Sequence, residues 1–292
     1  MLILETPRYN FRSVAFSPDG RHLAVGADKQ RAQVWDLEHR RVVFEQTVVA
    51  ATDASASVAF LDNHRLLIGN RLFIDECRWA DNTTRNLFTT ESTRVEYGAF
   101  TVAPNGSSLV LCDFHSRLQR YSLDQRAPAL EWTASLDRYV GFALTCSADG
   151  SRIACGLYNG QVSIFDAATG RHLNTLGEEK AAQIGAVGIS PDGKTIVWAG
   201  GPRLHFWREG ETRYHSLGRT HFLGIAFHRS GDFFATAKGD GTVDTWDTRT
   251  GERRDSYDWK VGKLNGVAFD ATGDRAAACS ATGKIVIWDV DH

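Results

Sequence analysis

The residues that could take part in catalysis or metal binding are spread along the sequence and are not grouped. Ten histidines and 35 Asp and Glu residues occur. None falls in an HExxH, GxSxG, Walker-type or GxGxxG pattern, the patterns that mark metal, nucleophile and phosphate sites. His205 and Cys77 are expected inside strands, where a role in the core is favoured over ligation. The sequence therefore predicts no catalytic residue, no metal ligand and no cofactor, and a protein that is not an enzyme.

The cysteines do not form a recognisable framework. Cys77, Cys112, Cys146, Cys155 and Cys279 are odd in number, include no CxxC pair and lie in apolar stretches such as LVLC and RIAC. A disulfide scaffold and a zinc finger are therefore disfavoured. We expect small buried thiols in a cytoplasmic protein.

The charge balance and the apolar pattern argue against two classes of partner. The 33 basic and 35 acidic residues give a net charge of −2, and acids are interleaved with the arginines. A protein with this balance is not attracted as a whole to phosphate backbones, so nucleic acid is not expected as a partner. No run of 18 apolar residues exists, and the start MLILETPR lacks the cationic and long apolar parts of a secretory signal, so no membrane association is expected.

The sequence repeats about every 42 residues. Each repeat has an apolar anchor just before a turn signal, and these anchors are Phe16, Phe60, Val102, Cys146, Ile189, Phe227 and Phe269. An aromatic residue follows each anchor after 18 or 19 residues, namely Trp35, Trp79, Tyr121, Phe165, Trp207, Trp246 and Trp288. A fixed period of this length indicates one supersecondary unit repeated along the chain.

Each repeat is predicted to contain four short antiparallel strands. The segments are short, apolar and rich in β-branched or aromatic residues. Asp-Gly and Asn-Gly pairs such as Asp19-Gly20 and Asn159-Gly160 separate them and supply the positive backbone angles of tight hairpins. Seven units of four strands are the pattern of propeller blades.

This pattern resembles the WD-repeat (WD40) β-propeller family. The resemblance covers essentially the whole chain and is carried by Trp35-Asp36, Trp246-Asp247, Trp288-Asp289 and the SPDG turns at Ser17 and Ser190. It implies an all-β fold, a seven-bladed β-propeller with four antiparallel strands per blade. The blades are expected at about 10–48, 54–90, 96–133, 140–177, 184–218, 222–258 and 265–290 plus 2–5, so that residues 1–292 form a single propeller.

The two ends of the sequence predict how the ring closes. The last repeat lacks a fourth strand, because only Asp289 to His292 follow Trp288, and Leu2 to Glu5 is an unassigned apolar segment before the first repeat. The resemblance implies that this segment is the outer strand of the last blade, paired with Lys284 to Asp289, which covers an otherwise open sheet edge.

The polar relay that the family often buries is mostly lost. Of the expected His, Asp and Ser or Thr, only the sixth repeat keeps the acid, Asp240, with Thr236 at the Ser position, and Gly218 stands where the His would be. We therefore expect apolar and aromatic packing between blades to supply the stability. Phe16, Phe227 and Phe269 are expected to be buried there.

The resemblance implies a function as a non-catalytic scaffold or adaptor for protein–protein interaction, which binds a protein or peptide on one propeller face. An enzyme or small-ligand binder that uses the central channel is the alternative, and a channel lined by converging acids or histidines would favour it.

Aromatic residues at loop positions predict where a partner binds. The repeat alignment places Phe114, Phe142 and Tyr158 on neighbouring blades where most other blades carry Gly, Ala or Leu, and Arg138 and Tyr139 lie in the connecting loop beside them. Aromatic and Arg side chains are common binding anchors because they bury much area with few rotatable bonds. Trp259 and Lys260, before the seventh repeat, are a second candidate.

Overall fold

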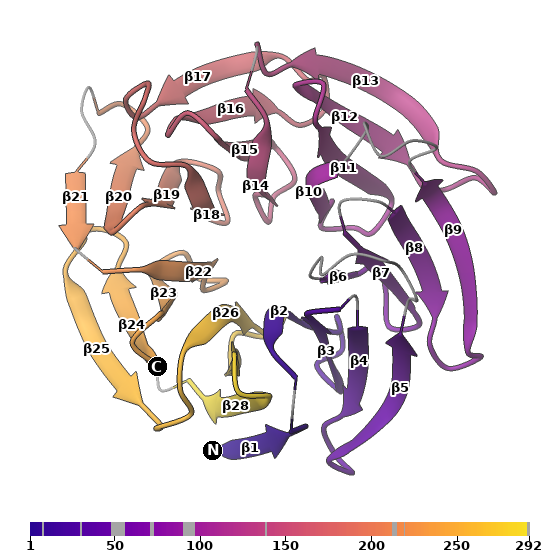
Figure 1. Cartoon of the computed structure of the whole chain (residues 1–292). Coiled ribbons are helices and arrows are strands. Elements are labelled where there is room, and N and C mark those ends of the chain that lie inside the picture. Colours follow the sequence, from indigo (N-terminus) through magenta and orange to yellow (C-terminus); the bar gives the residue numbers. More distant parts are fainter. Residues whose placement is uncertain are drawn as a thin grey trace.

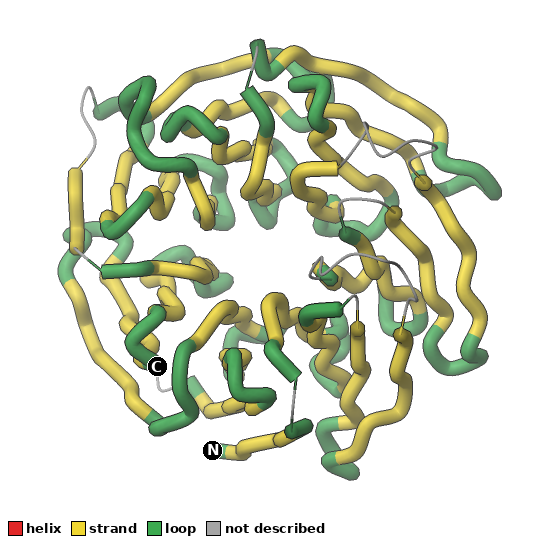
Figure 2. Tube along the Cα trace, in the orientation of Figure 1, coloured by secondary structure: helices red, strands yellow, loops and turns green. Residues whose placement is uncertain are grey.

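The computed structural model describes residues 1–7, 9–29, 31–47, 56–70, 73–89, 97–137, 139–211, 215–218 and 220–290. All 28 elements within these residues are strands, and they form seven four-stranded antiparallel sheets. The sheets are arranged as blades around a central axis (Figure 1). The first strand of each blade is innermost and short loops join the strands (Figure 2). The predicted seven-bladed propeller is confirmed.

The strand bounds follow the repeat. Blade 1 contains β2 (Phe11–Phe16), β3 (His22–Ala27), β4 (Arg31–Asp36) and β5 (Arg41–Thr47), and blade 2 contains β6 (Ser57–Phe60), β7 (Arg65–Gly69), β8 (Phe73–Arg78) and β9 (Thr83–Thr89). Blade 3 contains β10 (Tyr97–Val102), β11 (Ser108–Asp113), β12 (Arg117–Ser122) and β13 (Ala129–Ser135), and blade 4 contains β14 (Gly141–Cys146), β15 (Arg152–Leu157), β16 (Val162–Asp166) and β17 (His172–Leu176). Blade 5 contains β18 (Ile184–Ile189), β19 (Thr195–Gly200), β20 (Arg203–Arg208) and β21 (His215–Gly218). Blade 6 contains β22 (Phe222–Phe227), β23 (Phe233–Lys238), β24 (Thr242–Asp247) and β25 (Arg253–Asp258), and blade 7 contains β26 (Leu264–Phe269), β27 (Arg275–Ser280), β28 (Lys284–Asp289) and β1 (Leu2–Glu5).

The N-terminal strand closes the ring, as the sequence predicts. β1 lies beside β28 (Figure 1) and pairs with it in antiparallel register, from Leu2 opposite Ile287 to Glu5 opposite Lys284. Leu4 is buried in the cluster that joins blade 7 to blade 1, whereas Ile3 on the other face of the strand is 43% exposed. The first and last segments of the chain thus share one sheet and hold the ring together.

The hydrophobic core is divided among the interfaces between blades. Each buried cluster draws its residues from two neighbouring blades. Between blades 4 and 5, for example, Ile164 packs in one cluster with Trp198 and Trp207. Between blades 7 and 1, Ile285 shares a cluster with Leu23. A blade therefore buries its apolar surface only against its neighbours, as expected of a repeat architecture.

The first anchors differ from the expectation. Phe16, Phe227 and Phe269 pack against the clusters between blades but are only half-buried, so the prediction of full burial is wrong. Each ends the first strand of its blade, and Phe227 and Phe269 line a cavity at one mouth of the central channel. The end of an innermost strand has no further blade to cover it, which leaves part of the ring exposed.

Arginine side chains add a second kind of contact between blades. In successive blades an Arg donates to a backbone carbonyl of the next blade: Arg120 to Ala167 (2.6 Å), Arg152 to Gly193 (3.1 Å), Arg208 to Thr248 (2.8 Å), Arg229 to Thr272 (3.4 Å) and Arg275 to Gly20 (2.6 Å). A guanidinium has five donors on a long stem, so it can bind its own blade and reach the next one. The sequence has 26 arginines and seven lysines. These hydrogen bonds give some of the arginines a structural role.

Candidate functional site

The loops of the propeller fall on two faces. Because the four strands of a blade alternate in direction, the loop between its second and third strands lies on the same face as the connection to the next blade. We call this the connection face. The opposite turn face carries the turns between first and second and between third and fourth strands.

A β-bulge recurs at the start of the first strands on the connection face. The pairing of β14 with β15 shifts register between Gly141 and Ala143, which leaves Phe142 unpaired. The same shift leaves one unpaired residue in five other blades: Arg12, Gly98, Gly185, Leu223 and Asn265. A bulge re-aims the side chain of its extra residue. Phe142 is the aromatic member of this ring of bulge positions around the central axis.

The structure brings the three predicted aromatic residues into contact. The ring centroids of Phe114 and Phe142 are 6.1 Å apart in an edge-to-face arrangement, and those of Phe142 and Tyr158 are 5.8 Å apart. We call these three residues the aromatic row. Phe114 and Phe142 are half-buried, whereas Tyr158 is 60% exposed. A chain of aromatic rings that ends in an exposed tyrosine offers a partner apolar area and a phenol hydroxyl together.

The surroundings hold the aromatic row in place. The backbone N–H of Tyr158 donates to the carbonyl of Val140 at 2.9 Å. Gly141, before Phe142, lies where an added Cβ would be 2.6 Å from Cys155 Sγ and 2.8 Å from Cys112 Sγ. The two thiols are buried and come from neighbouring blades, so the strand that carries Phe142 is packed directly on the interface between blades 3 and 4.

Of the residues expected beside this row, Tyr139 is described and Arg138 lies outside the described residues. Tyr139 is half-buried against the core between blades 3 and 4, and its hydroxyl donates to the carboxylate of Glu179 in the next connection. Tyr139 therefore ties two neighbouring connections together. Its binding role stays a prediction, as does that of Arg138.

The second candidate, Trp259 and Lys260, divides into a packed and an exposed residue. The ring of Trp259 stacks 5.6 Å from Tyr257 and lies 4.7 Å from Trp288, and it packs on the cluster between blades 6 and 7. Lys260 is exposed, has φ of +57°, and binds the carboxylate of Asp258. Much of the Trp259 ring thus packs against other residues of the protein. A partner contact at Trp259 and Lys260 stays a prediction.

The mouth of the central channel on the turn face is mainly apolar. A cavity of about 420 Å³ lies there, and its lining includes Ile225, Phe227 and Phe269, with Arg229 and Asp270 as charged members. Asp270 is bound by Arg275 of its own blade at 3.1 Å. This lining favours apolar contact over acid–base chemistry. Among the described residues, no three His, Cys, Asp or Glu side chains are grouped so that they could hold a metal ion.

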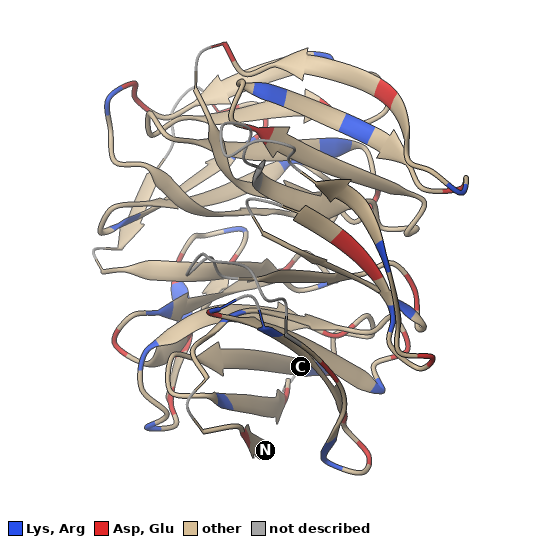
Figure 3. Cartoon of the chain, turned by 45° about the vertical axis from the view of Figure 1, so that its right-hand side comes forward, with Lys and Arg blue, Asp and Glu red and all other residues tan. Residues whose placement is uncertain are grey.

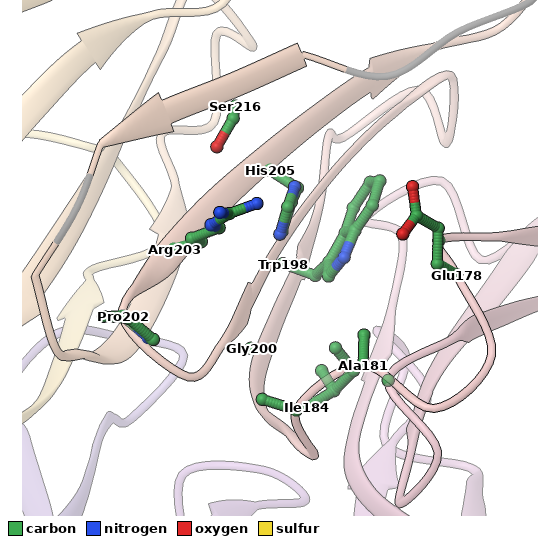
Figure 4. A pocket seen from close by; sticks show the side chains of 12 residues that line it. Glu178, Ala181, Ile184, Trp198, Gly200, Pro202, Arg203, His205 and Ser216 are labelled. Atoms are coloured by element: carbon green, nitrogen blue, oxygen red, sulfur yellow. The ribbon is translucent and has the colours of Figure 1, made fainter.

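A second cavity, which sequence reasoning missed, lies on the connection face between blades 4 and 5. Its volume is about 670 Å³, within the usual range of ligand sites. Figure 4 shows His205 beside Trp198, with Arg203 and Glu178 on either side. The rings of Trp198 and His205 stack at 5.2 Å because these residues are direct partners across β19 and β20. A cross-strand Trp–His pair next to a Gly-Pro turn is the sequence signal that could have drawn attention to it.

The pKa of the His205 imidazole lies below its ordinary value, which favours the neutral ring. Burial lowers the pKa of this imidazole and the nearby Arg203 guanidinium lowers it further, while Glu178 acts in the opposite direction. Trp198 is buried beneath the surface, and Arg203 and Glu178 are exposed at the rim. The expected core role of His205 is therefore only partly right, since the half-buried ring packs on Trp198 and also lines the cavity.

Comparison with known proteins identifies the repeats. The WD40 family (WD domain, G-beta repeat) matches residues 4–36, 213–247 and 257–289. These stretches include Trp35-Asp36, Trp246-Asp247 and Trp288-Asp289. The crystal structure of the Cps50 (Swd1) β-propeller domain of Myceliophteria thermophila superposes with a TM-score of 0.78 at 14% identity, covering 99% of this chain and 100% of that one. The fold is thus that of a β-propeller built from repeats, and the chain belongs to the WD40-repeat β-propeller family.

Three curated relatives are similar over parts of their length. Target of rapamycin complex subunit wat1 of Schizosaccharomyces pombe is 28% identical over 138 residues, which are 46% of this chain and 43% of that protein. The tRNA (guanine-N(7)-)-methyltransferase non-catalytic subunit wdr4 of Danio rerio is 26% identical over 168 residues, 56% of this chain and 40% of that protein. Telomerase protein component 1 of Mus musculus is 22% identical over 281 residues, 94% of this chain and 9% of that protein. The chain spans less than half the length of each of these relatives.

No helix that could cross a membrane occurs in the described part of the chain. On the side of the molecule that Figure 3 shows, basic and acidic residues are interspersed over the strands and loops. That distribution agrees with the near-zero net charge of the sequence.

Proposed function

We propose that this propeller is a non-catalytic scaffold that binds a protein partner on its connection face, with the aromatic row as the central contact. The observation that carries the proposal is the row itself, in which exposed Tyr158 continues the half-buried rings of Phe142 and Phe114. Water solvates such a surface poorly, so covering it favours association. Two relatives are named as subunits, one of a complex and one as non-catalytic, which supports a role through partners.

The test compares three tagged baits in a pull-down read by quantitative mass spectrometry. A Phe114→Ala/Tyr158→Ala chain should lose the partner that the unchanged chain captures. Truncating a binding hot spot costs about 2 kcal/mol or more, roughly thirtyfold in affinity. The matched control is Leu130→Ala/Leu173→Ala, which removes two exposed apolar side chains from the outer strands β13 and β17. Capture of the same partner at full strength by the Phe114→Ala/Tyr158→Ala chain would refute the proposal.

A melting curve separates binding from folding. Phe114 is half-buried, so its truncation can lower the melting temperature. If it does, the single variant Tyr158→Ala becomes the deciding test of partner binding, because a side chain that is 60% exposed contributes little to the core. That the chain works in the cytoplasm stays a prediction, which imaging of the tagged chain in cells tests.

A further inference from the structure

Two cavities on the turn face join into one groove, here called the mouth groove. One cavity, of about 420 Å³, lies at the mouth of the central channel, and the other, of about 340 Å³, lies between the turn-face loops of blades 3 and 4. Cys146, at the end of β14, and Ala148 line both of them. The groove therefore runs from the channel mouth outward to Ala167, which follows β16. Such an elongated shape suits an extended chain segment.

The inner part of the groove is apolar and is held from behind. The ring of Phe227 lies 5.2 Å from that of buried Phe234, and the ring of Phe269 meets buried Phe233 edge-to-face at 5.7 Å. Phe227 and Phe269 are thus packed on one side, and they line the groove as half-buried side chains. Water solvates such a surface poorly, so covering it favours association.

The rim of the groove is tied across neighbouring blades. The backbone N–H of Asp149 in blade 4 donates to the carbonyl of Pro191 in blade 5 at 3.0 Å. Within its own turn, Asp149 Oδ1 accepts from Ser147 Oγ at 2.6 Å and from the N–H of Ser151 at 2.9 Å. A site that is already formed loses little affinity to reorganisation when a ligand binds.

The charges of the groove favour an uncharged ligand. The groove is lined by two basic and two acidic residues, and each binds a partner within the described structure: Asp270 with Arg275 (3.1 Å), Arg120 with Glu131 (2.6 Å), Asp149 with Ser147 (2.6 Å) and Arg229 with the carbonyl of Thr272 (3.4 Å). A charged ligand group would compete with these bonds or leave its own charge in apolar surroundings, and either lowers its affinity. A guanidinium has five N–H donors, so Arg229 can also bind a peptide carbonyl.

We propose that the mouth groove binds an extended, uncharged segment of a second protein partner, rich in large apolar side chains. An aromatic or branched aliphatic side chain of the segment covers Phe227 and Phe269 at the channel mouth. The segment then passes Cys146 and Ala148 and leaves between blades 3 and 4. This site lies on the face opposite to the aromatic row, so it goes beyond the function proposed above. With both faces occupied, the ring joins two partners.

The experiment selects peptides for this groove. Random dodecapeptides displayed on phage are first depleted on the immobilised Ala148→Glu chain and then selected on the unchanged full chain. Enriched peptides are synthesised with blocked ends and titrated by fluorescence anisotropy. We expect them to share an uncharged stretch with an aromatic or branched aliphatic residue. Ala148→Glu and Ala271→Glu should each weaken binding by about tenfold or more, because each places a carboxylate in the apolar groove. Both alanines are exposed, and melting curves check that the variants are folded.

An exposed alanine elsewhere on the turn face provides the control. Ala80→Glu makes the same change in blade 2, at a residue that lines neither cavity, and should leave peptide binding unchanged. The inference is overturned if no peptide is enriched, if the enriched peptides need a charged residue to bind, or if Ala148→Glu and Ala271→Glu bind like the unchanged chain.

The two proposals fail separately. The Phe114→Ala/Tyr158→Ala chain should still bind the groove peptides while it loses the partner of the aromatic row. The Ala148→Glu chain should capture that partner and lose the peptides. Loss of both ligands in the folded Ala148→Glu chain would contradict a separate site on the turn face and would leave the proposed function standing.

Discussion

Trp246 shows how much of the family's polar relay one blade retains. Its indole N–H donates to Thr236 Oγ1 at 3.0 Å, and the hydroxyl of Thr236 lies 3.4 Å from the carbonyl of Asp244. Asp240, at the acid position, instead binds the backbone N–H and hydroxyl of Thr242 in its own turn. The Trp246–Thr236 hydrogen bond is therefore present without the rest of the relay. Gly218 occupies the position of the His that would connect Thr236 to Asp240.

Replacing Thr236 by Val should destabilise the protein. Valine has nearly the same shape, so the change removes the hydroxyl and leaves the buried indole N–H of Trp246 without an acceptor. Such a group costs about 1–3 kcal/mol. Chemical denaturation should show a lower midpoint for Thr236→Val and a nearly unchanged one for Thr236→Ser, which keeps the hydroxyl. Equal midpoints for Thr236→Val and the unchanged chain would show that the bond contributes nothing.

Gly141→Ala should destabilise through steric overlap with a pair of thiols. The new Cβ would lie 2.6 Å from Cys155 Sγ and 2.8 Å from Cys112 Sγ, both fully buried. Overpacking of this kind costs about 1–3 kcal/mol. Gly185→Ala is the matched control, because a Cβ there meets nothing within 4 Å. Adding Cys155→Ala to Gly141→Ala should recover part of the loss, and equal melting temperatures for the two glycine variants would contradict this explanation.

At the scale of elements, β1 links the ends of the chain. Its four residues pair with β28, and Leu4 is buried to 4% exposure in the closing interface. An outer strand covers the edge of the strand beside it, and an open edge invites pairing with other chains. The ring therefore depends on a segment that lies far from its partners in sequence.

Removing this strand should reduce stability and solubility together. Deletion of residues 1–6 exposes β28, so we expect a sharply lower melting temperature and aggregation in light scattering. Leu4→Ala should lower stability by about 2–5 kcal/mol through loss of buried contacts. Ile3→Ala, on the exposed face of the same strand, should be close to neutral. Unchanged melting of the truncated chain would contradict closure by β1.

At the scale of the whole molecule, the same turn recurs after the aromatic anchors and makes stability depend on acid pH. The Asp after the anchor accepts hydrogen bonds at each of three positions. Asp36 accepts from His39 and Asp166 from Thr169 within the turn, whereas Asp247 accepts from Arg249 and Thr250 of its turn and from Arg254 of β25. The Arg254 guanidinium, helped by the two backbone N–H groups, lowers the pKa of Asp247 to about 2 from 3.8. The Thr169 hydroxyl lowers the pKa of Asp166, and the His39 backbone N–H lowers that of Asp36.

These shifts predict the acid limb of stability. A carboxylate whose pKa is lower in the folded state stabilises fully above its unfolded pKa, and this stabilisation is lost as pH falls through the folded value. For Asp247 the window runs from about pH 4 down to pH 2. Asp247→Asn should therefore melt lower than the unchanged chain at pH 7, and the difference should shrink below pH 4. Asp289→Asn, at a side chain that is 82% exposed, is the control, and a pH-independent difference for Asp247→Asn would contradict the assignment.

The sequence by itself determined the number of blades, the order of strands and the closing role of Leu2 to Glu5. The reason is that a constant period places equivalent residues at equivalent points of every blade. For the same reason it located the aromatic row, since Phe142 stands at a position that is bulged in several blades, and Phe114 and Tyr158 stand in equivalent loops.

What only the tertiary structure decided lies between blades. The half-exposure of Phe16 and Phe269, the packing of Trp259 on Trp288 and the reach of Arg275 to Gly20 all depend on how neighbouring sheets are placed against each other. So does the cavity between blades 4 and 5, whose walls come from two blades and their connection. A repeat pattern describes one blade at a time. Contacts across an interface depend on the shapes of two different blades, and these shapes diverge wherever the repeats diverge.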